Sequence, residues 1–401
     1  MVRSAIFGLL ALCGCARQTA SPLTAGEFAA ARWEDVVKRA AGSTVYFGMW
    51  AGDEARNRYY QSDVTERLQR QYQITLRIVP ASDTAQIVNK LLNERRAGRA
   101  AGSIDMLWIN GENFRTAKEA GVLWGPFAER IPNVRFYDPL SLRRDFGTPI
   151  EGFEAPWQRS EYVFAYDSAR VPAPPKSFAA LRDWVKAHPG RFTYIAPPDF
   201  TGSAFIRHVL MLQGDAAGFR TFDEAFYQKA AAGAIAYLND LKPFLWRRGE
   251  TYPPSLSELT RMFANSEVDF TMSYGPSYAS MKIARGELPA ATRTFVMDSG
   301  ALGNYSYLAI PFNAANAAGA LVAINHLLSF DHMLEQSTRL GDSLPHQLDP
   351  LTPQQRAAAE AIPRGPATLS EAELAAHFMA EPDAQYLTRF EQDWLLKVLR
   401  K

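Results

Sequence analysis

The sequence predicts an α/β protein made of two lobes. Segments with strand-like and helix-like patterns alternate along most of the chain, which is typical of α/β architecture. The 401 residues also exceed the length at which a single hydrophobic core usually stops growing. With 47% hydrophobic and 21% charged residues, the composition is that of an ordinary globular protein. We therefore expect two cores of mixed strands and helices.

The N-terminus has the pattern of an export signal. Arg3 precedes an apolar run at residues 5–12, which is too short to span a membrane because a spanning helix needs about 20 apolar residues. The Leu-Cys-Gly-Cys that follows resembles a bacterial lipobox, and the small glycine before Cys15 makes this cysteine the candidate for lipidation. We expect a signal peptide at residues 1–14, a lipid anchor on Cys15 and a polar tether at residues 15–35. An ordinary signal peptide with incidental cysteines is the alternative.

Charge and residue content argue against several kinds of site. The chain has 43 basic and 42 acidic residues and no basic run, which argues against nucleic acid as a partner. Both cysteines lie in the signal segment, so cleavage at Cys15 leaves no thiol for a disulfide, a metal or a nucleophile. The six histidines lack metal-ligand spacing, and neither a Gly-x-Ser-x-Gly nor a Gly-x-x-x-x-Gly-Lys motif occurs. We expect no catalytic residues, no metal and no cofactor.

The first half of the chain predicts three strands and two helices. Residues 44–50 form an apolar and aromatic run that ends in a Gly/Asp turn. Residues 64–73 and 83–97 carry apolar side chains at helical spacing, and residues 74–79 form a second β-branched run between them. Residues 104–109 form a third strand, which stops at an Asn-Gly turn.

The second half repeats this order of elements. Residues 192–196 read as a strand stopped by two prolines, followed by a helix at residues 203–212. Residues 268–273 form another predicted strand, which breaks at a Gly-Pro pair. A last strand at residues 305–311 leads into an apolar helix at residues 314–328, whose two Asn and one His favour burial in protein over a membrane span.

Candidate binding residues follow four of these strands. Ligands of open parallel sheets sit beyond the carboxyl ends of the strands, where glycines allow close approach, aromatic rings stack and polar groups orient. The alternative for any single cluster is an ordinary tight turn without a binding role, because such turns also favour Gly, Asn and Asp. The candidates are Trp50 and Asp53; Trp108, Asn110, Gly111, Glu112 and Asn113; Asp199, Thr201, Gly202 and Ser203; and Tyr274, Gly275, Ser277 and Tyr278.

Three segments resemble a known family. Residues 264–278 (ANSEVDFTMSYGPSY) are similar to the stretch of extracellular solute-binding proteins of ABC importers, the maltose- and thiamine-binding group, in which a Gly-Pro turn leads into a ligand-facing helix. Residues 104–111 (IDMLWING) resemble the strand and binding loop of that family, and residues 161–167 (EYVFAYD) its crossing strand. The run at residues 107–114 looks most similar to the YnjB-type subgroup.

The resemblance implies a type II periplasmic-binding-protein fold, in which two α/β lobes are joined by a hinge and clamp the ligand between them. The chain would cross between lobes near residues 155–161, 298–304 and 341–350, which adds Trp157 and Tyr305 to the candidate site. It also implies a monomer outside the cytoplasmic membrane, periplasmic or extracytoplasmic, that delivers a small molecule to an ABC permease. The expected lobes are residues 36–157 plus 299–345, and residues 158–298 plus 346–401.

The candidate loops suggest the chemistry of the ligand. They hold the acids Asp53, Glu112 and Asp199 together with several aromatic rings, and no Lys or Arg. Acids and ring faces suit an organic cation such as thiamine or a polyamine, and a carbohydrate is the next candidate. Two other classes stay open. One is a glycosidase that uses Glu112 and Asp199 as paired carboxylates, and the other is an adhesion or scaffold lipoprotein without a cleft.

Overall fold

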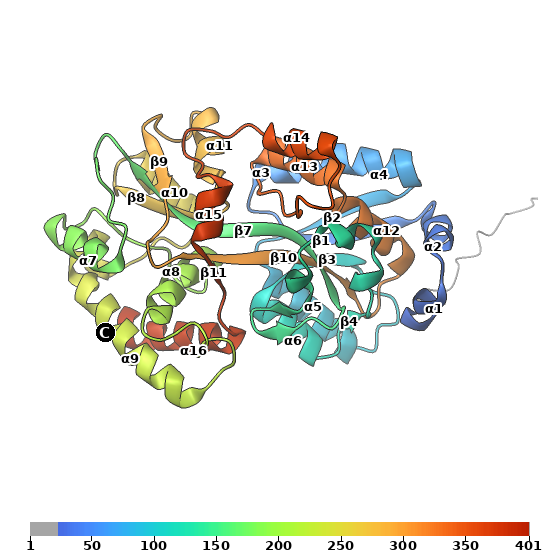
Figure 1. Cartoon of the computed structure of the whole chain (residues 1–401). Helices are drawn as coiled ribbons and strands as arrows, with labels where there is room; N and C mark the ends of the chain where they lie inside the picture. Colours follow the sequence, from blue (N-terminus) through green and yellow to red (C-terminus); the bar gives the residue numbers. More distant parts are fainter. Residues whose placement is uncertain (1–22, 401) are drawn as a thin grey trace, which may run out of the picture.

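Two α/β lobes are joined by two long antiparallel strands in the computed structural model, which describes residues 23–400 (Figure 1). These strands are β7 (Glu154–Asp167) and β10 (Ala301–Pro311). They pair from Gly303 with Glu161 to Ala309 with Glu154. Because each strand is longer than this shared stretch, its two ends enter different lobes. The expected signal peptide at residues 1–14 and the expected anchor Cys15 lie outside the described residues.

The first lobe is built on a mixed sheet. Its strands β1 (Thr44–Trp50), β2 (Thr75–Ala81) and β3 (Met106–Ile109) run parallel, and β10 joins β3 in the antiparallel sense. Two clusters of buried side chains cover its faces, one formed with the helix α12 (Ala317–Leu327). The carboxyl ends of β1 and β3 therefore meet at one edge, as the sequence predicted.

The second lobe continues the other end of β7. There β7 pairs with β8 (Phe270–Tyr274) and β9 (Thr292–Phe295), and the almost wholly buried helix α8 (Phe200–Met211) packs into the same core. The predicted strand at residues 192–196 is wrong. This segment is extended and buried, but its backbone bonds reach loops, Phe192 O accepting from Trp246 N at 2.8 Å. Burial alone produced its strand-like composition.

In the described part of the chain, the strands of both lobes named so far belong to one continuous nine-stranded sheet, whose main path has the order β2-β1-β3-β10-β7-β8. The remaining elements join or cover this sheet and connect the lobes. The other helices are α1 (Ala25–Ala30), α2 (Trp33–Ala40), α3 (Glu54–Tyr59), α4 (Thr65–Tyr72), α5 (Thr84–Arg96), α6 (Gly111–Glu119), α7 (Phe178–Ala187), α9 (Glu224–Leu241), α10 (Leu256–Ala264), α11 (Tyr278–Ala284), α13 (Phe330–Leu340), α14 (Pro353–Glu360), α15 (Glu371–Ala376) and α16 (Ala384–Trp394). The other strands are β4 (Leu123–Trp124), β5 (Arg144–Asp145), β6 (Thr148–Pro149) and β11 (Phe378–Ala380). Among residues 23–400, no helix is both long enough and apolar enough to cross a membrane.

Part of the expected tether is folded. Within residues 15–35, the short helix α1 begins with a capping box between Thr24 and Glu27. Its Phe28 is 1% exposed and packs 5.9 Å from the ring of Trp124. The buried Phe28 and the capping box together hold this segment on the first lobe, so the expected tether is folded from Thr24 onward.

The chain returns to the second lobe later than expected. Beyond the expected crossing at residues 341–350, helix α14 packs beside α13 on the first lobe, through a cluster that includes Phe330, Leu351 and Ala359 (Figure 1). Only then do α15 and β11 reach the second lobe, where β11 pairs with β10. This path brings α16 to the second lobe at the end of the chain.

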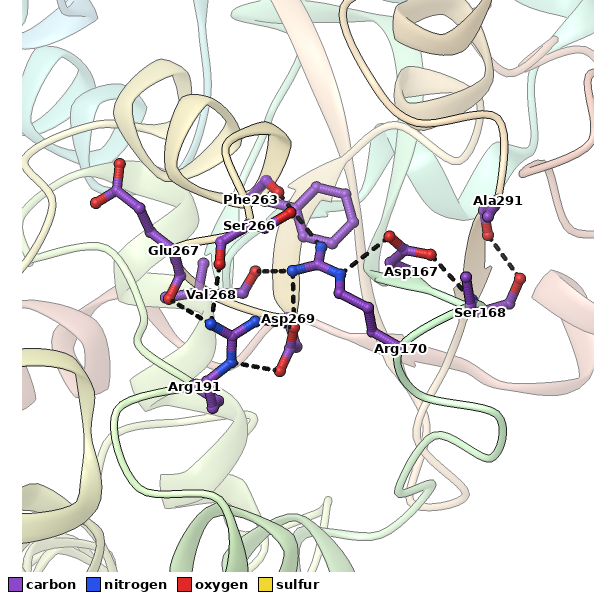
Figure 2. Close-up of polar contacts among 11 residues, drawn as sticks. Asp167, Ser168, Arg170, Arg191, Phe263, Ser266, Glu267, Val268, Asp269 and Ala291 are labelled. Atoms are coloured by element: carbon purple, nitrogen blue, oxygen red, sulfur yellow. Dashed lines mark hydrogen bonds and ion pairs between the residues drawn. The ribbon is translucent and has the colours of Figure 1, made fainter.

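A charged network anchors the start of β8 (Figure 2). Asp269 holds two arginines, Arg170 at 2.8 Å and Arg191 at 2.5 Å, and Arg170 also binds Asp167 at 3.0 Å. Arg191 further donates to the carbonyl of Ser266, which has a positive φ of 61°. The network fastens the turn before β8 to the end of β7, and none of its residues lines the cleft.

Candidate ligand-binding cleft

A cavity of about 270 Å³ lies where the two lobes meet the crossing strands. This volume is close to the lower end of the range of ligand pockets, about 300–1,000 Å³. Both lobes, both crossing strands and the C-terminal helix contribute side chains to it. Ten of the sequence-predicted residues line the cavity: Trp50, Trp108, Asn110, Glu112, Asn113, Asp199, Thr201, Ser203, Tyr274 and Gly275.

A wider opening of about 950 Å³ adjoins this cavity. The two share wall residues, among them Trp50, Asp83 and Asp199, so the opening is the mouth of the cavity. The predicted residues Asp53 and Tyr278 lie in this mouth and do not line the inner cavity.

Five predicted residues line neither space, and four of them have a packing role. Trp157 is fully buried beneath Trp108, with ring centroids 5.1 Å apart. A Cβ on Gly202 would lie 2.3 Å from the carbonyl oxygen of Ile195, so this glycine permits close packing of α8. Gly111, at φ +59°, donates its amide to Asp145. Tyr305 packs against two cores of the first lobe, where burial raises its pKa to about 12. Ser277, just before α11, is the fifth.

Three aspartates around the cleft are helix N-caps. The side chain of Asp53 accepts from Arg56 N at 2.9 Å, Asp83 from Ala85 N at 2.7 Å, and Asp199 from Thr201 N at 2.9 Å. Each satisfies backbone donors that the first turn of a helix leaves open. Burial still raises the pKa of Asp199, although these backbone bonds oppose the rise. Part of the acidic signal in the sequence is therefore structural.

Two glutamates in the cavity have no such capping role. Glu112 lies in the first turn of α6 on the first lobe, and Glu391 lies on α16 of the second lobe. Burial, and then the neighbouring Glu391, raise the pKa of Glu112 to about 7. Burial also raises the pKa of Glu391, which accepts a hydrogen bond from Ser203. Glu112 Oε2 has no hydrogen-bond partner among residues 23–400.

Arginines reach the cleft from outside the predicted loops. Arg56 on α3 lines the cavity, where it binds Asp342 at 2.7 and 2.9 Å and lies 5.7 Å from the ring centroid of Trp108. Arg207 on α8 is fully buried behind the wall and binds Glu381 at 2.8 and 3.0 Å. Each arginine therefore has its own carboxylate partner within the same lobe.

The Arg207–Glu381 pair is part of a network that holds Tyr274 in the wall. Arg207 Nη2 donates to the hydroxyl of Tyr274 at 2.9 Å, and that hydroxyl donates to Glu381. Asn304, from the crossing strand β10, donates to the same carboxylate at 3.3 Å. Because Tyr274 packs 4.9 Å from Phe200, the network also fixes an aromatic wall on the second lobe. The hinge and the wall are thus directly connected.

The sequence patterns missed several cavity residues. Gln158, Ser160, Asn304 and Ser306 come from the crossing strands, and their polar character inside otherwise apolar strands is a signal that could have located them. By contrast, nothing local in the sequence marks Glu391. Helix α16 lies at the end of the chain and reaches the cavity only through the tertiary fold.

The lobes already touch on one side of the cavity. The hairpin of β5 and β6 in the first lobe meets the start of α16 in the second, where Ala384 N donates to Phe146 O at 2.9 Å. Phe146 also packs 6.2 Å from Phe200 of the second lobe. The cavity is therefore bounded on this side and open at the mouth. Within residues 23–400, no cluster of three or more His, Cys, Asp or Glu side chains is arranged to hold a metal ion.

Comparison with known proteins matches this architecture. The family model described as bacterial extracellular solute-binding protein matches residues 63–347. Protein YnjB of Escherichia coli (strain K12) is 38% identical over 372 residues, which cover 91% of this chain and 94% of YnjB.

Solved structures show the same fold at low sequence identity. The spermidine/putrescine ABC transporter substrate-binding protein PotD from Streptococcus pneumoniae aligns with a TM-score of 0.63 and 15% identity, over 90% of this chain and 100% of PotD. The periplasmic binding protein AfuA from Actinobacillus pleuropneumoniae, with fructose-6-phosphate bound, aligns with a TM-score of 0.63 and 14% identity, over 89% of this chain and 98% of AfuA. The predicted type II periplasmic-binding-protein fold is thereby confirmed.

Proposed function

This chain belongs to the bacterial extracellular solute-binding proteins, and we propose that it captures a small organic cation for an ABC importer. The ABC assignment is supported by the shared fold with PotD, which is the substrate-binding protein of an ABC transporter. In this function the protein binds its solute reversibly and makes or breaks no bond.

One observation carries the choice of a cation. Glu112 and Glu391, which cap no helix, line the inner cavity beside the capping Asp83 and Asp199, whereas Arg56 in the same wall is paired with Asp342. A buried charge without a partner is costly, so a cavity with surplus carboxyl groups favours a ligand that brings positive charge. The same argument disfavours a phosphate or carboxylate as the main point of attachment.

Capture follows from the arrangement of the two lobes. A solute that touches both lobes stabilises the closed state over the open one, and its differential contacts set the size of the shift. The crossing strands β7 and β10 form the hinge of this motion, and the mouth is the route of entry. The closed form is then the one that the membrane permease accepts. A lipid on Cys15 would keep a monomeric receptor close to that permease outside the cytoplasmic membrane.

A carbohydrate is the second candidate. The cavity wall includes the amides of Asn110, Asn113 and Asn304 and the hydroxyls of Ser160 and Ser306, which could bind sugar hydroxyls. AfuA, of the same fold, is known with fructose-6-phosphate bound. A glycosidase is disfavoured, because the Asp199 side chain is engaged in capping α8.

A ligand screen by thermal unfolding tests the proposal. Purified mature protein is heated with amines, thiamine, sugars and sugar phosphates at matched ionic strength. A true ligand at one hundred times its Kd stabilises the folded state by about 2.7 kcal/mol. We expect stabilisation by a cation and its loss in Glu112→Gln. Stabilisation by uncharged sugars only would refute the cation assignment, and no stabilisation by any solute would favour an adhesion or scaffold role.

A further inference from the structure

The aromatic rings of the cleft are already engaged by the protein's own cations. Arg56 lies 5.7 Å from the ring of Trp108, Arg207 lies 5.5 Å from Phe200, and at the mouth Lys282 lies 5.6 Å from Tyr278. Quaternary ammonium ligands are usually bound in a cage of several vacant aromatic faces. Because these rings each hold a protein cation on one face, such a cage is a poor description of this cavity.

The other two rings of the inner wall, Tyr274 and Trp50, are also engaged. The Tyr274 ring packs 4.9 Å from Phe200 and 5.5 Å from Tyr162, measured between ring centroids. The Trp50 side chain packs so closely on Gly52 that a Cβ there would lie 2.0 Å from Trp50 Cζ2, and its edge meets Trp108 at a ring-centroid distance of 6.2 Å. The aromatic residues therefore serve mainly as rigid walls. Ligand charge has to be compensated by other groups.

The carboxylates of Glu112 and Glu391 can compensate the positive charge of a ligand, which the engaged aromatic rings cannot. Glu112 and Glu391 belong to opposite lobes, on helices α6 and α16 that pack together, and both line the cavity. Glu112 Oε2 lacks a hydrogen-bond partner among the described residues. An unpaired carboxylate oxygen in a buried wall is best satisfied by a charged N–H donor, which forms a short and strong hydrogen bond.

An independent observation also points to a polar ligand at this place. Gln158, on the crossing strand β7, lines the same cavity and is 3% exposed, yet its Nε2 has no hydrogen-bond partner among residues 23–400. Buried amides are nearly always hydrogen-bonded in native proteins. The unsatisfied atom is an N–H donor, so it indicates that an acceptor atom of a bound polar molecule lies here, in addition to any ammonium group.

From these contacts we infer that the cation is an amine-type group with N–H donors, clamped between Glu112 of the first lobe and Glu391 of the second. This inference rests on the proposed function and narrows its ligand class to protonated amines, amidines or guanidines. A fully methylated ammonium has the same charge but no N–H, and so cannot satisfy the two carboxylates.

The clamp also predicts proton exchange. In the empty protein a proton partly neutralises the pair, because burial and the neighbouring Glu391 raise the pKa of Glu112 to about 7. An amine that binds both carboxylates displaces this proton, so binding near pH 7 should release a fraction of a proton from Glu112. The titratable groups near the pair are Asp83 before α5, Arg207 of α8 and Asp145 of β5. Arg207 lowers the pKa of both glutamates and Asp83 raises it, whereas burial and the nearby Glu112 raise the pKa of Asp145 itself.

Matched ligand pairs test the inference. Calorimetry compares ethanolamine with choline, and butane-1,4-diamine with its fully N-methylated form, against the wild type, Glu391→Gln and the control Glu119→Gln. Glu119 is an exposed acid on the same helix as Glu112. We expect at least one amine to bind at least tenfold more tightly than its methylated partner. In Glu391→Gln that preference should disappear, whereas Glu119→Gln should bind like the wild type.

The outcomes separate this inference from the proposed function. Repeating the titrations at pH 7 in buffers of different ionisation heat measures the released proton, which should vanish in Glu112→Gln. Equal binding of the methylated partners would overturn the amine clamp but leave a cation receptor intact. Equal binding by Glu391→Gln and Glu119→Gln would also overturn it. Binding of sugars alone, with no response to any cation, would overturn the proposed function itself.

Discussion

Replacing Glu112 by Gln should stabilise the empty protein at alkaline pH. The folded state raises the pKa of Glu112 from 4.5 to about 7, mainly through burial. A raised carboxyl pKa means that the folded state favours the neutral form, so this group's contribution is fully present below pH 4.5 and is lost as pH rises through 7. At 1.36 kcal/mol per pKa unit, the loss amounts to about 3 kcal/mol. Gln stays neutral at every pH, so the variant avoids this loss of folding stability.

The assay is urea unfolding of the wild type and Glu112→Gln from pH 4.5 to 8.5, without ligand. The difference in unfolding free energy should be near zero at pH 4.5 and grow to about 3 kcal/mol in favour of the variant above pH 8. The matched control Glu119→Gln replaces an exposed acid on the same helix and should show no such growth. A difference between the wild type and Glu112→Gln that does not change with pH would refute the reasoning.

Three further predictions concern the wall, the second lobe and the N-terminus. Calorimetry should show that Trp50→Ala weakens ligand binding by about 1 kcal/mol or more. Tyr278→Ala should weaken it by less, because Tyr278 lies only in the mouth. Equal losses in the two variants would show that the mouth and the cavity bind the ligand alike. Asp269→Asn should lower the unfolding free energy by about 3 kcal/mol, since it leaves Arg170 and Arg191 without their shared partner, while ligand affinity stays unchanged. Mass spectrometry of the exported protein should find a lipid on Cys15, and an unmodified N-terminus would contradict the anchor.

Local patterns predicted the parts of the fold whose causes are local. The strands at residues 44–50 and 104–109 were predictable because a β-branched or aromatic run ends at a turn signal, and β1 and β3 lie there. The same rule failed at residues 192–196, where an equally apolar segment is buried against loops rather than another strand. The amino-acid composition of a segment indicates whether it is buried. It does not indicate whether its backbone hydrogen bonds are made to another strand or to a loop.

For the same reason, only part of the candidate site could be predicted from the sequence. The five cavity residues at the ends of β1 and β3 were found because the carboxyl edge of a parallel sheet is a general ligand position. Asp199, Thr201 and Ser203 were found although the segment before them is not a strand. Arg56, Arg207 and Glu391 lie within helices, where an ionisable side chain is usually a solvated one. Their approach to the cleft depends on packing between segments far apart in the sequence, which no single stretch of residues records.

The distribution of charge between the lobes explains how closure can depend on a ligand. Arg56 is paired with Asp342 inside the first lobe, and Arg207 with Glu381 inside the second, so a hinge motion separates neither pair. Glu112 and Glu391 are different, because they belong to opposite lobes, and in the proposed function closure brings them together. The repulsion between like charges therefore opposes closure of the empty protein at neutral pH, and a proton or a cation removes it. A receptor built in this way should close most readily around a solute that carries positive charge.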